Sequence, residues 1–238
     1  MSDVRTYLEQ TSLGPLLAPA EFRDLQAFAV ERSYARGAHL VTVGAAPSHW
    51  FGVIEGLVSL SVNHADGDQT MLAAVSDGGW FGEGTLMKAQ PWQFDAVALR
   101  KTRAVLIPAA QFRRLRDCSL GFNHFLQDLL NARLGRLIGA AICARHAPIE
   151  SRVARAVVDL INAASPGEAL LRVSQAEIAL LAGTSRQRAN ISLKRLGELG
   201  LVDVLRDGLR VRDFERLTAV SAGEETLPLP SPMAAARA

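Results

Sequence analysis

The chain has 238 residues, of which 49% are hydrophobic and 21% charged, and its formal net charge is +2. This composition is typical of a folded protein with a hydrophobic core, and it excludes a chain that is disordered throughout. The two cysteines, Cys118 and Cys143, are too few for a disulfide framework or a cysteine-rich metal site.

The sequence predicts neither a secretory signal nor a membrane helix. Its first five residues include an acid, and no apolar run follows them. The longest apolar stretch, residues 137–144, is far shorter than the roughly 20 residues that a membrane helix needs. We therefore expect a cytoplasmic protein with no membrane partner.

Basic residues are concentrated in one part of the chain. Residues 133–216 contain 14 Lys and Arg against 9 Asp and Glu, whereas residues 1–132 contain 11 against 13. The local net charges are thus +5 and −2. A basic segment of this kind favours a nucleic-acid partner, but a solvated basic face gives the same pattern.

The first domain is predicted to be rich in β-structure. Residues of about 1–28 have apolar spacing typical of short helices, interrupted by prolines. Between Glu31 and Pro108, short apolar or alternating runs are separated by glycine turns, which indicates an antiparallel barrel or sandwich. We expect this domain to span residues 1–115. The predicted strands are 39–43, 58–62, 70–75, 96–99 and 104–107.

A long helix is predicted to follow the β-rich domain, from about Ala109 to Arg145. It has one apolar stripe, which can pair with a second copy of the chain or pack on the chain's own domain. We assign residues 116–147 to a dimerisation helix and expect a homodimer. The residues of the stripe are Leu126, Leu130, Leu134, Leu137 and Ala141.

Residues 148–220 form the second predicted domain, which Pro148 separates from the long helix. Ser174 and Glu177 form a capping box before a short helix, and Gly183 supplies a turn before a second helix from about Arg186 to Glu198. Alternating residues around an Asp-Gly turn then predict a hairpin over 201–211. The pattern predicts a winged helix-turn-helix, followed by a disordered tail over 221–238.

The second helix of this motif begins with Arg186-Gln187-Arg188, although cations oppose the helix dipole at that end. Such a start is expected where a helix end enters the major groove, because Arg pairs with guanine and Asn or Gln pairs with adenine. Arg206 and Arg210 of the wing are candidate phosphate contacts. The alternative is an effector-binding or protein-interaction module whose winged helix does not read DNA. The predicted DNA contacts are Ser174, Thr184, Ser185, Arg186, Gln187, Arg188, Asn190, Lys194 and Arg206.

Several short landmarks follow one another along the chain: Arg36-Gly37 with Gly44, residues 54–58, residues 79–83, and the run from Gln175 to Arg186. In these landmarks the chain up to about residue 217 resembles the Crp/Fnr family of bacterial regulators. The resemblance implies an α+β fold with an antiparallel β-roll sensor domain, similar to cyclic-nucleotide-binding domains, before the dimerisation helix and winged helix. It also implies a palindromic DNA operator and RNA polymerase as a partner. From the residues themselves, we predict that the chain is not an enzyme. The family's second recognition arginine is replaced by Ile191.

The predicted effector pocket departs from the cyclic-nucleotide-binding members of the family. Gly82 and Glu83 match their Gly-Glu pair, but the phosphate-binding Arg-Ser positions fall on Phe94 and Asp95. A cyclic phosphate would lose its bidentate partner and meet a carboxylate, so we expect no cyclic AMP binding and take Glu83 for a turn residue. Residues 90–94 can fill the pocket or shape an apolar one.

No cofactor is predicted for the chain, although a haem or another small effector stays open. No pairing of nucleophile and base, phosphate-binding loop or metal-spaced cluster stands out in the sequence. We therefore predict no catalytic and no metal-ligating residues.

Overall fold

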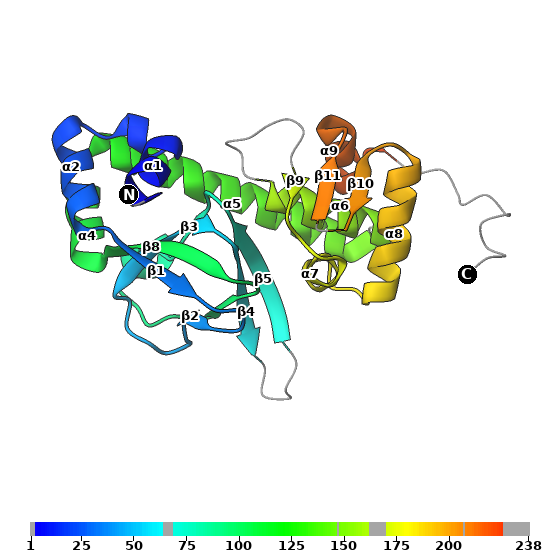
Figure 1. Cartoon of the computed structure of the whole chain (residues 1–238), viewed down its shortest axis with the longest axis horizontal. Coiled ribbons are helices and arrows are strands. Elements are labelled where there is room, and N and C mark those ends of the chain that lie inside the picture. The colour runs from blue at the N-terminus through cyan, green and yellow to red at the C-terminus, as the bar shows by residue number, and fades with distance from the viewer. Residues whose placement is uncertain (1–2, 64–68, 147, 162–169, 207, 226–238) are drawn as a thin grey trace, which may run out of the picture. The chain divides into compact units, whose positions relative to one another are not determined.

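The computed structural model describes residues 3–63, 69–146, 148–161, 170–206 and 208–225. The chain forms two compact units, Met1–Leu137 with Asp159–Pro166 and Ile138–Val158 with Gly167–Ala238. Antiparallel sheets, a long helix and a helix-turn-helix region make this the predicted α+β fold (Figure 1).

The first unit contains two four-stranded antiparallel sheets. One has the order β1-β8-β3-β6, with β1 (Val30–Tyr34), β8 (Thr102–Pro108), β3 (His49–Glu55) and β6 (Trp80–Phe81). The other has the order β2-β7-β4-β5, with β2 (His39–Val41), β7 (Asp95–Ala98), β4 (Leu57–Asn63) and β5 (Gln69–Ser76).

Five of these strands were predicted from the sequence, and β1, β3 and β6 were not. Strand β3 is buried along most of its length on both faces, so its residues lack the alternation that marks a half-buried strand. The helices of this unit that precede its long helix are α1 (Asp3–Gln10), the 3-10 helix η1 (Gly14–Leu16), α2 (Pro19–Phe28), α3 (Glu83–Lys88) and α4 (Ala109–Cys118).

The described residues of the first unit form two hydrophobic core clusters. One contains Trp50, Trp80, Phe112, Phe122 and Phe125, and joins the helices at the start of the chain to α4 and to the long helix α5 (Leu120–His146). The other fills the space between the two sheets with Phe51, Phe81, Trp92 and aliphatic residues. The second core occupies the place where the effector pocket was predicted.

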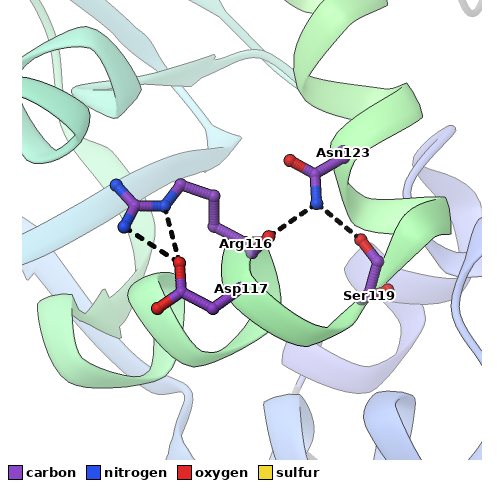
Figure 2. A network of polar contacts seen from close by, with 4 residues as sticks. All are labelled: Arg116, Asp117, Ser119 and Asn123. Atoms are coloured by element: carbon purple, nitrogen blue, oxygen red, sulfur yellow. Dashed lines mark hydrogen bonds and ion pairs between the residues drawn. The ribbon is translucent and has the colours of Figure 1, made fainter.

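The helix predicted from Ala109 onward is broken at Ser119, between α4 and α5. Asn123 Nδ2 donates to the carbonyl oxygens of Arg116 (2.6 Å) and Ser119 (2.8 Å), as Figure 2 shows. Ser119 Oγ accepts from the Phe122 backbone N–H at 3.1 Å. These bonds satisfy orphan groups at both helix ends and fix the start of α5.

The second unit is built around the winged helix. It contains most of α6 (Ile149–Leu160), then β9 (Leu170–Leu171), α7 (Gln175–Leu181), α8 (Arg186–Glu198), β10 (Val202–Leu205), β11 (Gly208–Val211) and α9 (Phe214–Ala222). The three strands form an antiparallel sheet in the order β10-β11-β9.

The predicted bounds of α8 and the predicted hairpin are confirmed. Strand β9 was not predicted, because two residues carry no periodic signal. Helix α9 continues through Ala222 and buries Ser221, so the predicted tail does not begin at residue 221. Residues 226–238 of that tail lie outside the described residues.

Candidate nucleic-acid interface and sensor interior

The first helix of the helix-turn-helix begins with the predicted capping box. Glu177 Oε2 accepts from the Ser174 backbone N–H at 2.6 Å, and Ser174 Oγ accepts from the Glu177 N–H at 3.2 Å. Because the hydroxyl oxygen acts as an acceptor here, the hydroxyl proton of exposed Ser174 is still free to donate to a phosphate.

The second helix, α8, is capped by Ser185, whose Oγ accepts from the Arg188 N–H at 3.3 Å. Thr184 precedes the cap, at the end of the Gly183 turn. One face of α8 is packed into the second unit and consists of Ala189, Ser192, Leu193 and Leu196. The other face carries the predicted contacts, with Arg186, Gln187, Arg188 and Lys194 exposed and Asn190 partly exposed.

Two contacts that the sequence did not predict hold α8 and its turn against α6. Arg195 Nη1 donates to Glu150 Oε1 at 2.9 Å, in a pair whose side chains are about one-fifth exposed. Arg152 Nη2 donates to the carbonyl oxygens of Ala182 (2.6 Å) and Gly183 (2.5 Å). These bonds satisfy carbonyls at the end of α7 and fix the direction in which the start of α8 projects.

The wing follows directly from α8. Strands β10 and β11 pair from Val202↔Val211 to Leu205↔Gly208. Arg212 Nε donates to Asp203 Oδ2 at 2.6 Å and braces the hairpin. Arg206 is exposed near the turn, and Arg210 is partly exposed on β11.

The interior of the β-roll is filled by Trp92. Its side chain is 1% exposed, and its ring centroid lies 5.3 Å from that of Phe94, 6.1 Å from Phe51 and 6.4 Å from Phe81. A Cβ added to Gly82 would lie 2.6 Å from the Trp92 ring, so the indole rests directly on the Gly82 backbone. Of the two readings of residues 90–94, the structure favours the one in which they fill the pocket.

The two residues at the phosphate-binding positions also have structural roles. Phe94 packs edge-on against Trp92. Asp95 is buried, and its carboxylate accepts from the Val43 backbone N–H (2.9 Å) and from Asn63 Nδ2 (2.8 Å). The Asp95 carboxylate, at the position that the family resemblance assigned to the phosphate, is thus held by bonds from two other parts of the first unit.

Glu83 is the first residue of α3 and is buried, not a turn residue as we had expected. Its Oε1 atom lies 2.5 Å from Arg133 Nη1 on α5, and Arg133 also donates to the Trp80 carbonyl oxygen. Burial and the nearby Arg136 lower the pKa of Arg133, and the charge of Glu83 only partly opposes that shift. Because arginine is so strongly basic, the guanidinium is charged at neutral pH all the same. The ion pair thus links the β-roll to the long helix.

Both parts of the chain match domains of known proteins. Residues 31–117 match the model of the cyclic nucleotide-binding domain, and residues 151–220 match the model of the Crp-like helix-turn-helix domain. The Cyclic AMP receptor protein of Thermus thermophilus is 27% identical over 87% of this chain and 95% of its own length. The cAMP-activated global transcriptional regulator Vfr of Pseudomonas aeruginosa is 24% identical over 73% of this chain and 85% of its own length.

The chain belongs to the Crp/Fnr family of transcription regulators. The fold agrees with that assignment. FixK2 from Bradyrhizobium japonicum has a TM-score of 0.66 to this structure at 19% identity, covering 81% of this chain and 96% of its own.

The apolar stripe of this Crp/Fnr regulator divides into two parts. Leu126 is buried in the first unit's own core, and Leu130 is partly exposed. Leu134 and Leu137 are 56% and 61% exposed. The side chain of Ala141 lies outside the described residues. Among the described residues of the stripe, Leu134 and Leu137 are therefore the ones that the chain's own core leaves mostly exposed.

Two absences hold for the part of this regulator that the structure describes. None of its helices there is long and apolar enough to cross a membrane. No group of three or more His, Cys, Asp or Glu side chains in that part of the chain could hold a metal ion.

Proposed function

We propose that this Crp/Fnr regulator is a homodimer that reads a palindromic DNA operator through α8 and does not respond to cyclic AMP. The observation that carries the proposal is the start of α8 (Figure 1), where exposed Arg186, Gln187 and Arg188 follow the Ser185 cap. The bonds of Arg195 and Arg152 fix α8 and the turn before it against α6, so the polar face of the helix is in a fixed orientation in which it can enter the major groove.

The surroundings of α8 supply phosphate contacts. The hydroxyls of Ser174 and Ser185 can each donate while their oxygens cap a helix, and Thr184 lies beside the second cap. Arg206 of the wing and Lys194 of α8 are exposed cations. These contacts set orientation and affinity, whereas Arg186, Gln187 and Asn190 supply base recognition.

A dimer supplies the second half-site contact. The exposed pair Leu134 and Leu137 gives α5 an apolar surface that a second copy of the same helix can cover. In such a dimer the two α8 helices should lie about 34 Å apart, one turn of DNA. Contact with RNA polymerase is a further expectation from the family.

The failure to respond to cyclic AMP follows from three features of the sensor domain. Trp92 occupies the interior, Asp95 places a carboxylate at the phosphate position, and Glu83 is already paired with Arg133. The two relatives above are named for cyclic AMP, so this departure separates the chain from them. Millimolar cyclic AMP should leave both the melting temperature and the operator affinity unchanged.

The DNA-binding proposal is tested by isolating bound genomic fragments and measuring affinity by fluorescence anisotropy at several salt concentrations. Arg186→Ala should weaken operator binding by about 1–3 kcal/mol and relax the sequence preference. Arg113→Ala, an exposed arginine of α4, is the matched control and should change neither. A wild-type protein that binds no duplex DNA at low salt would contradict the proposal.

A further inference from the structure

Ile191 interrupts the polar face of α8. The other branched aliphatic side chains within this helix, Leu193 and Leu196, are fully buried, whereas Ile191 is 54% exposed. A single exposed apolar residue is ordinary on a protein surface. Its position among candidate base-reading residues is what makes this one informative.

Helix geometry places Ile191 near the centre of that face. At about 100° per residue, Ile191 lies about 40° around the helix from Gln187 and about 60° from Lys194. The buried residues Ala189, Leu193 and Leu196 lie on the opposite side. The isoleucine therefore lies on the same side of the helix as Gln187, one of the proposed base-reading residues, and between the exposed cations Arg188 and Lys194.

The chemistry of Ile191 selects one feature of the major groove. Its side chain has no hydrogen-bonding atom, so it cannot pair with guanine as an arginine would. The base edges of the major groove offer one apolar group, the C5-methyl of thymine. Isoleucine is also a weaker helix former than Lys, Gln or Arg, so helix stability does not account for it at an exposed site.

We propose that Ile191 is a specificity-determining residue that contacts the C5-methyl group of one thymine in each half-site. This inference rests on the proposed reading of DNA by α8, and it names the base feature that the middle of the helix recognises. The operator therefore contains, in each half-site, a thymine whose methyl group contributes to affinity.

The test removes that methyl group without changing any hydrogen bond. Each thymine of a selected operator half-site is replaced singly by deoxyuridine, and affinities are measured for the wild type, Ile191→Ala and Ile191→Val. At one position per half-site, the wild type should lose about fourfold in affinity, the value of one buried methyl group. Ile191→Val should keep most of that discrimination, and Ile191→Ala should bind the two operators equally.

Lys194→Ala is the matched control from the same face of α8. It removes a charge, so it should weaken binding to thymine and deoxyuridine operators by the same factor. Because Ile191 is exposed, its variants should melt at the wild-type temperature, which separates a binding effect from a folding effect.

The outcomes separate this inference from the proposed function. If the wild type binds its operator but no deoxyuridine position discriminates it from Ile191→Ala, the role of Ile191 is refuted and DNA reading by α8 stands. If the wild type binds no DNA, both are refuted.

Discussion

Replacing Trp92 with alanine tests whether its side chain is what fills the β-roll. The indole is 1% exposed and contacts Phe51, Phe81 and Phe94, so Trp92→Ala removes a large buried ring from the centre of one core. Truncation of a buried tryptophan costs about 3–5 kcal/mol, because transfer free energy is lost and a cavity remains. For a chain of this size, that corresponds to a decrease in melting temperature of about 6–20 °C.

The cavity left by this substitution offers a second readout. Free indole has the shape of the missing ring and should bind in the space above Gly82. At a concentration about 100 times its Kd, it should restore about 2.7 kcal/mol of stability. The free energy of unfolding is measured by urea titration, with and without indole.

The control for this experiment is Phe28→Ala, because Phe28 is 51% exposed at the end of α2. This variant should lose little stability and should not respond to indole. If Trp92→Ala costs less than about 1 kcal/mol and indole does not stabilise it, the roll is not filled as described.

Three further predictions concern other contacts. Glu83→Gln should cost about 1–3 kcal/mol in urea unfolding, less than a fully buried pair, because the Arg133 side chain is still 26% exposed. Burial raises the pKa of Tyr7 well above about 10, so the unfolded chain releases this proton first and stability falls as pH rises through that value. Tyr7→Phe should remove that part of the alkaline loss in urea titrations at pH 9–11. Leu137→Lys should give a monomer mass in light scattering, because it places a charge on the exposed stripe.

Each of these three has its own check. Glu9→Gln alters an exposed ion pair with Arg5 and should change the free energy of unfolding little, so an equally small loss in Glu83→Gln would argue against the buried pair. Wild type and Tyr7→Phe losing stability in parallel above pH 10 would show that Tyr7 does not hold its proton on folding. Leu72→Lys, at an exposed site on β5, should leave the dimer intact. A monomeric wild type at micromolar concentration would contradict the dimer itself.

The helix-turn-helix could be predicted almost to the residue because its signals are local. The capping box at Ser174 and the turn at Gly183 each lie within a few residues of the bonds they form. The Asp-Gly turn marked the hairpin in the same way. Short-range hydrogen bonds of this kind can be predicted from the residue types within a few positions of each other.

The sensor interior could not be predicted to the same depth, because its contacts are long-range. Glu83 and Arg133 are 50 positions apart in the sequence, and no sequence pattern around either residue indicates that the two form an ion pair. In the second unit, Arg152 is likewise 30 and 31 positions from Ala182 and Gly183, whose carbonyl oxygens it binds. The periodicity of α5 showed a stripe but not which part of it the chain's own core would cover, and Leu126 proved to be inside that core. The spacing of apolar residues predicts which face of a helix is buried, whereas the tertiary fold decides which element packs against that face.

The most direct test of the account is the ratio of operator affinity to non-specific DNA affinity for the wild type and for Arg186→Ala at a fixed salt concentration. We expect a wild-type ratio of about 10³ or more, and a decrease of about 5- to 150-fold in the variant. Equal ratios for the two proteins would show that the start of α8 does not read bases.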